Sequence, residues 1–282
     1  MDYDAQYWVE SYRGLMRRRG GDDVARREEI RRARWDERAP EFAKPTGRSD
    51  SYAARLVEAL RLSPGDSLFD MGCGPGTIAI PVAMRGHHVI AVDFSQGMLN
   101  ELEKRASAAG CIALIEPFQR SWNESWEGLP TATVALSSRS FGVDDIADGI
   151  AKLESKATER VAISLGAGDY PFRDQRIFKA MGRENEPAMP ARQMTCVLNY
   201  LLSIGRFPEI SYIAHRSTWG RPTREELVAH IEEVHAPQTA EESRRLGDFL
   251  DTQITFNEES QKWEYPLEEA SRFAVIQWPV LR

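Results

Sequence analysis

Glycine and aspartate residues in the first half of the chain have a spacing that could bind a ligand. Gly72, Gly74 and Gly76 lie together directly after a short apolar run, and Asp70 ends that run. Glycine permits positive φ angles and lets the backbone approach a bound molecule closely. Asp93 ends the next apolar run, where a carboxylate can accept hydrogen bonds from ribose hydroxyls. The spacing predicts a site for a nucleoside.

The residues around the glycines distinguish between two kinds of nucleoside. A nicotinamide dinucleotide requires G-x-G-x-x-G/A, so that the following helix packs closely beside a pyrophosphate. Here Thr77 stands at the third position of that pattern, and Pro75 interrupts the loop. Asp70 would repel a pyrophosphate, whereas it would attract the ammonium and sulfonium groups of S-adenosylmethionine. We therefore expect a cationic nucleoside.

The elements that would position these residues alternate between strand and helix. Strands are predicted at 67–70, 88–93, 112–115, 133–136 and 161–165, with helices at 77–84, 96–109 and 144–156. This order is typical of a parallel sheet with helices on both faces.

The two ends of the chain show other patterns. Residues 1–45 and 52–60 are predicted to be mainly helical. The last part is predicted to contain helices at 174–181, 194–202, 225–234 and 241–250, and strands at 209–213 and 273–280. Without an internal repeat or a low-complexity linker, we expect a helical extension over 1–50 and one domain over 51–282, with an insertion on the substrate side at 169–205.

Two sequence motifs resemble those of the class I S-adenosylmethionine-dependent methyltransferases. Residues 68–77, Leu-Phe-Asp-Met-Gly-Cys-Gly-Pro-Gly-Thr, resemble the first motif, and residues 92–99, Val-Asp-Phe-Ser-Gln-Gly-Met-Leu, resemble the second. The resemblance covers roughly residues 35–165. It implies an α/β fold with a mostly parallel, seven-stranded Rossmann-like sheet, an N-terminal helical lid and an insertion after the fifth strand. It also implies a methyltransferase that uses S-adenosylmethionine.

The resemblance assigns roles to individual residues around the cofactor. Asp70 would lie near the amino end of the methionine part, and Asp93 would bind the ribose. Trp122 at the adenine edge could equally be a core residue. The other residues expected to line the cofactor are Gly72, Cys73, Gly74, Gly76, Phe94, Ser95, Met98, Ser121 and Ser138.

Candidate catalytic residues lie farther along the chain. The methyl acceptor should sit over the ends of the fourth and fifth strands, next to Ser138 and Arg139. Ser138 would face the reacting methyl group or cap a helix. Arg139 would bind a carboxylate or phosphate of the substrate, or it would pair with Asp144 or Asp145. If the acceptor is a hydroxyl group, His215 is the candidate general base.

Aromatic residues near the N-terminus are candidates for a lid and for a dimer contact. Trp35 and Phe42, at helical spacing, and Tyr52 could cover the cofactor. Tyr7, Trp8 and Tyr12 could form a homodimer contact or pack on their own chain.

Composition restricts the class of protein and its partners. The net charge of the 282-residue chain is −7, which disfavours a nucleic-acid partner. Neither a secretory signal nor an apolar run long enough for a membrane span is present, so we expect a cytoplasmic protein without a membrane contact. Three scattered cysteines predict neither a disulfide framework nor a metal site. A small-molecule methyltransferase is the first hypothesis; the alternatives are a non-catalytic cofactor-binding regulator and an RNA methyltransferase that uses the arginine-rich N-terminal segment.

Overall fold

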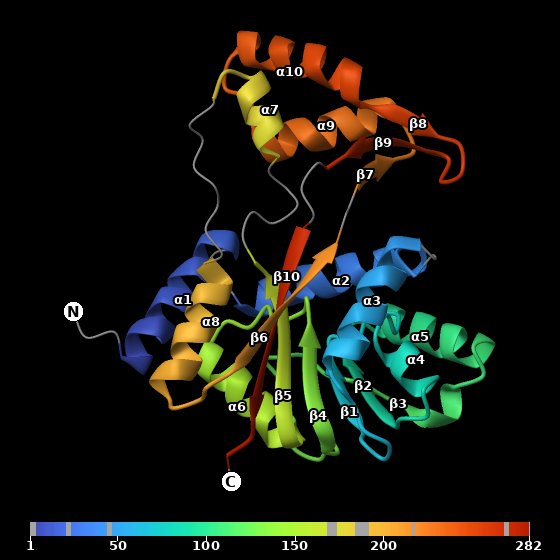
Figure 1. Ribbon diagram of the computed structural model, residues 1–282, viewed down its shortest axis with the longest axis vertical. Helices are drawn as coiled ribbons and strands as arrows, with labels where there is room; N and C mark the ends of the chain where they lie inside the picture. Colours follow the sequence, from blue (N-terminus) through green and yellow to red (C-terminus); the bar gives the residue numbers. More distant parts are fainter. Residues whose placement is uncertain are drawn as a thin grey trace. The chain divides into compact units, whose positions relative to one another are not determined.

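A computed structural model describes residues 4–20, 24–43, 47–167, 174–183, 192–215, 218–267 and 271–281 (Figure 1). The chain forms two compact units. The first comprises Met1–Leu165, Arg192–Ile213 and Phe273–Arg282, and the second comprises Gly166–Ala191 and Ala214–Arg272. The predicted division between a helical extension and a domain at residue 50, and the predicted insertion at 169–205, stay predictions.

The first unit is built on a seven-stranded sheet. Its strands follow the order β3 (Ile115–Gln119), β2 (Val89–Asp93), β1 (Leu68–Met71), β4 (Ala132–Ser138), β5 (Ala157–Gly166), β10 (Ser271–Pro279) and β6 (Glu209–His215). The first five strands in this order pair in parallel. β10 is antiparallel to β5, because the Ala167 amide donates to the Arg272 carbonyl oxygen and the Val280 amide to that of Glu159. The predicted mostly parallel sheet is confirmed.

The strand order reverses between β1 and β4, and this reversal locates the site. In open α/β sheets, ligands bind beyond the carboxyl ends of the strands where the order reverses. Asp70 on β1 lies level with Leu136 on β4 and with Ala91 on β2. The predicted glycine turn therefore follows the strand at the reversal point.

Helices cover both faces of this sheet. The helices α3 (Gly47–Ala59), α4 (Ala79–Ala83) and α5 (Gln96–Ala108) share an apolar core with Leu68 and Val89. Phe69 points to the opposite face and packs on Trp126, over which lies Lys152 of α6 (Ile146–Lys156). The helix α1 (Ala5–Gly20) packs against α6 and α8 (Arg192–Ser203), and α2 (Val24–Phe42) packs against α5.

The second unit is a small α/β module with its own core. It contains α7 (Gln175–Ala180), α9 (Arg224–His235), α10 (Ala240–Gln253) and a three-stranded antiparallel sheet of β7 (Thr218–Arg221), β9 (Lys262–Pro266) and β8 (Thr255–Asn257). Trp219 stacks on Tyr265 in the core. His235 is buried; its Nδ1 lies 2.9 Å from the Ile231 carbonyl oxygen, and its Nε2 accepts from the Asp174 amide at 2.9 Å.

Two sequence predictions about strands were wrong or incomplete. Residues Ile112–Leu114, predicted as a strand, form a 3-10 helix, and β3 begins only at Ile115. β3 is an edge strand, which explains how Pro117 fits without an amide donor. The strands of the small sheet were not predicted. β8 has only three residues, and neither it nor β7 nor β9 contains a continuous apolar run.

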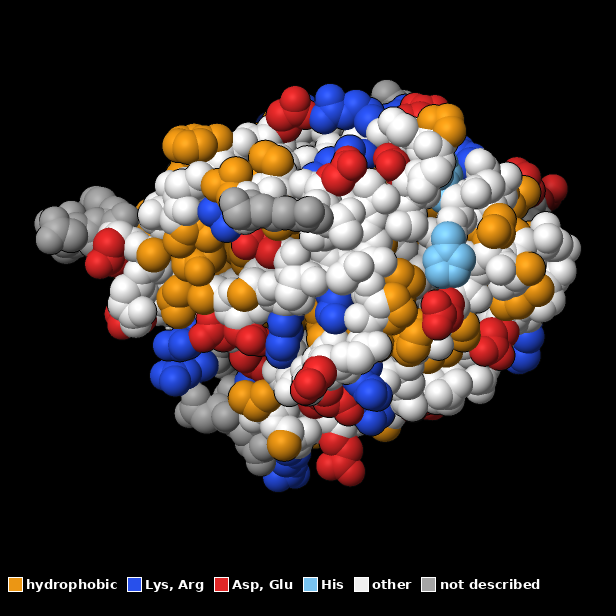
Figure 2. Space-filling model, turned by 90° about the horizontal axis from the view of Figure 1, so that it is seen from below, with side chains coloured by type: hydrophobic (Ala, Val, Ile, Leu, Met, Phe, Trp, Pro, Cys, Tyr) orange, Lys and Arg blue, Asp and Glu red, His pale blue; other side chains and the backbone are white. Residues whose placement is uncertain are grey.

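The surface carries charges of both signs. Acidic and basic side chains are interspersed on the face drawn in Figure 2. None of the helices in the described ranges combines the length and the apolar character needed to cross a membrane.

Candidate active site

The first strand ends in a turn whose geometry requires glycine. Gly72 has a φ of +76°, and a Cβ atom there would lie 2.3 Å from the Cβ atom of Ser140. The Gly72 and Cys73 amides both donate to the Val92 carbonyl oxygen, at 2.7 and 3.0 Å. Ser140 Oγ donates to the Met71 carbonyl oxygen at 2.7 Å. The loop after β4 thus rests on the turn after β1, and a side chain at Gly72 would push them apart.

Asp93 closes the same turn from the end of β2. Its Oδ2 accepts from the Gly74 amide and its Oδ1 accepts from the Ser95 amide, both at 2.9 Å. Burial raises the pKa of Asp93 above its ordinary value, although the amide donors favour the charged form. A carboxylate has about four acceptor positions, so Asp93 can still accept hydrogen bonds from ribose hydroxyls.

Asp70 differs from Asp93 in having no hydrogen-bond donor. It is buried, and within the described ranges neither of its carboxylate oxygens has a hydrogen-bond partner. Burial, together with the negative charge of Asp93, raises the pKa of Asp70 to about 7. A buried carboxylate without a partner is costly in free energy, and a cationic ligand would remove that cost.

A residue from α2 supports the start of α5, next to Asp93. Ser95 caps α5 by accepting from the Met98 amide at 3.1 Å, and its Oγ donates to Asp36 Oδ1 at 2.6 Å. The Gly97 amide donates to the same Asp36 oxygen at 2.9 Å. A Cβ atom at Gly97 would lie 3.0 Å from the Asp36 backbone. The close approach of α2 therefore depends on a glycine in the first turn of α5.

The rest of α2 contacts three of the loops beyond the parallel strands. Arg31 lies over the Phe94 ring, 5.7 Å from its centroid, after β2. Glu28 accepts a hydrogen bond from Asn123, after β3, and Arg27 pairs with Asp144 at 2.7 Å, after β4. Because the loops belong to neighbouring strands, α2 forms a strap across the carboxyl edge of the sheet (Figure 1).

The predicted adenine-edge residues and Gly76 are packed within the protein. Trp122 is nearly buried, its Nε1 donates to the Ser140 carbonyl oxygen at 3.0 Å, and its ring contacts Phe141. Ser121 is buried, and its Oγ accepts from a backbone amide. A Cβ atom at Gly76 would lie 2.4 Å from Leu102 Cδ1, so this glycine also permits helix packing. Whether these residues touch the cofactor stays a prediction.

On the opposite side of the turn, Tyr52 joins the ends of β4 and β5. Ser138 and Ser164 are level with each other on these strands, and the Tyr52 hydroxyl group lies 2.9 Å from Ser138 Oγ and 2.6 Å from Ser164 Oγ. Burial raises the pKa of Tyr52, which keeps the phenol protonated at neutral pH. The Arg139 guanidinium lies over the Tyr52 ring, 4.3 Å from its centroid. Tyr52 was expected as a lid residue; it is a buried part of the first unit's core.

These contacts exclude one predicted role each for Arg139 and Ser138, and the side chain of His215 cannot be placed. Arg139 does not pair with Asp144 or Asp145, because those carboxylates bind Arg27 and Arg13. Ser138 binds Tyr52 instead of capping α6, whose cap is Asp145. His215 ends β6, and its side chain lies outside the described residues.

Asp36 and Ser164 belong to the site but were not selected from the sequence. Asp36 bonds to Ser95, 59 positions away, and Ser164 bonds to Tyr52, 112 positions away. Neither residue lies in a recognisable motif. The sequence offered only a weak signal, a hydroxyl at the end of the fifth predicted strand.

Comparisons with known proteins connect this geometry to a family. The family model of the methyltransferase domain matches residues 68–153. An uncharacterized protein of Haemophilus influenzae is 32% identical over 252 residues, which cover 88% of this chain and 90% of the relative.

The chain belongs to the class I S-adenosylmethionine-dependent methyltransferases. It is an enzyme, and its methyl donor is S-adenosylmethionine.

Other similarities are partial. The chloroplast magnesium protoporphyrin IX methyltransferase of Arabidopsis thaliana is 36% identical over 109 residues, which cover 38% of this methyltransferase and 35% of the relative. A proposed methyltransferase from Bacillus halodurans has a crystal structure that superposes with a TM-score of 0.51 at 14% identity, covering 82% of this chain and 99% of that one. At this identity the superposition shows the fold alone.

The residues of this methyltransferase fit its cofactor. S-adenosylmethionine carries an ammonium group, and the unpaired, buried carboxylate of Asp70 provides a matching acceptor. Its ribose offers two hydroxyls, for which Asp93 retains acceptor positions. The glycine turn lets the backbone approach the ligand.

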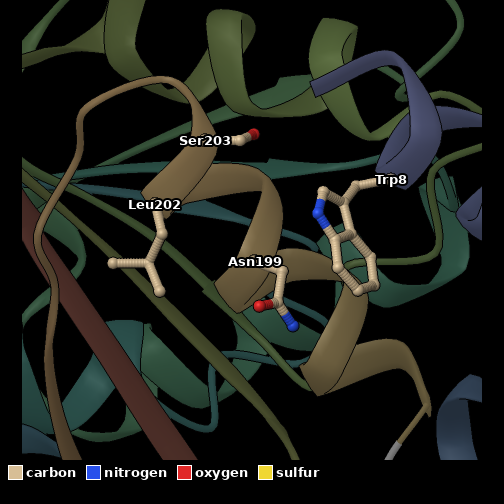
Figure 3. Close-up of a pocket in the computed structure, with 4 residues that line it drawn as sticks. All are labelled: Trp8, Asn199, Leu202 and Ser203. Carbon is tan, nitrogen blue, oxygen red and sulfur yellow. The ribbon is translucent and has the colours of Figure 1, made fainter. Parts of the chain in front are cut away.

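A separate pocket lies between α1 and α8, away from the glycine turn. It has a volume of about 460 Å³ and is lined by Trp8, Asn199, Leu202 and Ser203. Figure 3 shows the Trp8 indole beside Asn199. Asn199 and Ser203 each donate to a carbonyl oxygen of their own helix, and the lining has no charged side chain. The neighbouring Tyr12 is buried, and its hydroxyl donates to the Phe141 carbonyl oxygen at 3.2 Å. Of the two roles expected for Tyr12, a homodimer contact or packing on its own chain, the structure shows packing on its own chain.

Proposed function

We propose that this methyltransferase transfers a methyl group to a small-molecule acceptor held beyond the ends of β4 and β5. The observation that carries the proposal is the strap: α2 crosses the loops after β2, β3 and β4 through Arg31, Glu28 and Arg27. A site covered by its own helix suits a small acceptor better than a polymer. Enclosure also excludes water from the reaction.

The chain's own residues would bind and align the reactants. S-adenosylmethionine supplies a methyl group that is already activated by its sulfonium. Asp70 would hold the ammonium group and Asp93 the ribose hydroxyls. Tyr52, kept protonated by burial, would fix the ends of β4 and β5 through Ser138 and Ser164. Alignment of the nucleophile is the main demand in such a displacement.

We consider an RNA acceptor a weaker candidate than a small molecule. The RNA hypothesis depends on the arginines of the N-terminal segment, but several of them are engaged within the chain. Arg13 and Arg27 pair with Asp145 and Asp144, and Arg32 pairs with Glu28 at 3.1 Å. Phosphate binding would have to break these pairs, in a protein with a net charge of −7.

Calorimetry and a turnover assay test the proposal. We expect saturable binding of S-adenosylmethionine by the native chain and a loss of about a hundredfold in affinity for Asp93→Ala, on the order of 3 kcal/mol for charge-assisted hydrogen bonds. Asp248→Asn, an exposed carboxylate on α10, is the matched control and should bind normally. Formation of S-adenosylhomocysteine would then be measured across phenols, thiols, amines and carboxylic acids.

The possible outcomes separate the hypotheses. Absence of binding by the native chain contradicts the assignment of the site. Binding without turnover on any acceptor favours the non-catalytic regulator. Turnover on RNA, with an affinity that falls steeply with salt, would restore the RNA hypothesis.

A further inference from the structure

We infer, on the basis of the proposed function, that Arg139 binds an oxyanion of the methyl acceptor, either a carboxylate or a phosphate. The substrate is then an anionic small molecule. Three features of Arg139 support this assignment: its place at the edge of the sheet, the rings that hold its side chain, and the absence of an acidic partner.

Arg139 lies where β4 ends, between two residues that are fixed to other parts of the site. Its amide donates to the Ser164 carbonyl oxygen at 3.0 Å, Ser138 bonds to Tyr52, and Ser140 Oγ donates to the Met71 carbonyl oxygen at 2.7 Å. Its φ is +56°, in the left-handed region that residues with a Cβ atom rarely adopt. Such backbone outliers concentrate at functional sites.

Two aromatic rings hold the side chain. The guanidinium carbon lies 4.3 Å from the centroid of the Tyr52 ring and 5.7 Å from that of Phe273. Tyr52 is itself fixed by hydrogen bonds to Ser138 and Ser164. A guanidinium that lies over a ring keeps the N–H donors at its edge available for a carboxylate or phosphate. The cation is therefore positioned but not neutralised.

No acidic residue in the described part of the chain occupies those donors. Asp144 pairs with Arg27 at 2.7 Å, and Asp145 pairs with Arg13. The Arg139 side chain makes neither a hydrogen bond nor an ion pair with any other described residue, and it is exposed. An exposed, prearranged arginine beside a binding site is suited to bidentate recognition of an anion.

The carboxylate of the cofactor itself is the competing partner, but the position of Arg139 after β4 disfavours it. An ammonium and a carboxylate on one carbon would require their protein partners to lie close together. Arg139 lies over the ring of Tyr52, whose hydroxyl group binds Ser138 and Ser164 at the ends of β4 and β5, whereas Asp70 lies on β1. Arg139 therefore serves the Tyr52 side of the site, toward β5.

The test uses the full chain saturated with S-adenosylhomocysteine. Benzoate and phenyl phosphate are titrated by calorimetry, with benzamide as the uncharged match to benzoate. We expect at least one anion to bind saturably and at least tenfold more tightly than benzamide. In Arg139→Gln that anion should lose at least tenfold in affinity, whereas S-adenosylhomocysteine should change by less than twofold. Which anion binds distinguishes a carboxylate substrate from a phosphate substrate.

Arg139→Gly protects the test against a folding defect. Glycine accepts the positive φ without strain, so this variant should fold at least as stably as the native chain and still lose the anion. Equal affinity for benzoate and benzamide, or no saturable binding of either anion, overturns the assignment. So does a tenfold loss of S-adenosylhomocysteine affinity in both variants, because Arg139 would then bind the cofactor's carboxylate. If the native chain binds no S-adenosylhomocysteine, the proposed function fails instead.

Discussion

Asp70, on β1, and Arg139, directly after the neighbouring β4, are both without a partner of opposite charge among the described residues, but they differ in burial. Asp70 is buried, and this burial together with the negative charge of Asp93 raises its pKa to about 7. Arg139 is exposed and remains a cation over two rings. The buried acid is suited to a cationic group that is always the same, the cofactor's ammonium. The exposed arginine is suited to the variable partner, the acceptor. The β1–β2 side and the β4–β5 side of the site can therefore be tested separately.

The contact between the two sides should be the most sensitive to substitution. Gly72→Ala combines a left-handed φ with a Cβ atom 2.3 Å from that of Ser140, so we expect it to lower the free energy of unfolding by about 3–5 kcal/mol. Gly74→Ala is the matched control, because its φ is +54° but no atom lies within 4 Å of the added Cβ. It should cost only about 1–2 kcal/mol. Urea denaturation measures both.

A second-site variant checks the cause of the Gly72→Ala defect. Ser140→Gly removes the atoms that the new methyl group would meet. Ser140→Gly also removes the hydrogen bond from Ser140 Oγ to the Met71 carbonyl oxygen, so this variant alone is the reference. In that background Gly72→Ala should cost only about 1–2 kcal/mol, as Gly74→Ala does. If Gly72→Ala still costs about 3–5 kcal/mol there, the contact between the two loops is not the reason for the glycine.

Asp70→Asn tests the β1–β2 side through pH. Without cofactor the folded chain keeps the Asp70 proton up to about pH 7, whereas the unfolded chain releases it near pH 4, so native stability declines as the pH rises across that range. Relative to Asp70→Asn the loss should reach about 4 kcal/mol. Cofactor binding requires the charged form, so native affinity should fall up to tenfold per pH unit below pH 7. Cofactor binding near or below pH 7 should therefore release a proton from Asp70, which calorimetry in two buffers of different ionisation enthalpy detects. Asp70→Asn should abolish this proton release.

A pH-independent affinity in the native chain would contradict this account. It would mean that Asp70 is already ionised in the free protein, or that the cofactor binds elsewhere. Asp70→Asn should also bind the cofactor about tenfold to a hundredfold more weakly at pH 8, since a neutral amide replaces the carboxylate beside a cation.

The β1–β2 side could be predicted from the sequence because its determinants are local. Gly72, Asp70 and Asp93 lie within one strand–turn–helix–strand unit, and each keeps its expected place. On the other side, the ends of β4 and β5 could be located, but Tyr52 meets Ser138 across 86 positions and Ser164 across 112. No local pattern encodes such contacts. For the same reason the short strands of the second unit escaped prediction.

Tyr52→Phe tests the β4–β5 side. It removes the hydroxyl group that joins Ser138 to Ser164 and leaves their buried oxygens without this partner, so we expect a loss of about 1–3 kcal/mol in the free energy of unfolding. The phenyl ring remains under Arg139, so S-adenosylhomocysteine affinity should change little. Tyr212→Phe, an exposed tyrosine on β6, is the control and should stay within about 0.5 kcal/mol of the native chain. If both variants changed the free energy of unfolding equally, the hydrogen bonds of the Tyr52 hydroxyl group to Ser138 and Ser164 would not contribute to stability.

Asp36→Ala should have the smallest effect, because it acts on the β1–β2 side only through the strap. Its carboxylate accepts from Ser95 Oγ and the Gly97 amide, at the positive end of α5. Removing it should cost about 1 kcal/mol of stability and weaken S-adenosylhomocysteine binding about twofold to fivefold, as the strap loosens next to Asp93. The neighbouring Glu37→Ala, an exposed carboxylate on the same helix, should alter neither quantity. If Asp36→Ala instead weakened benzoate or phenyl phosphate binding more than S-adenosylhomocysteine binding, α2 would act on the acceptor, and the two sides could not be separated as argued.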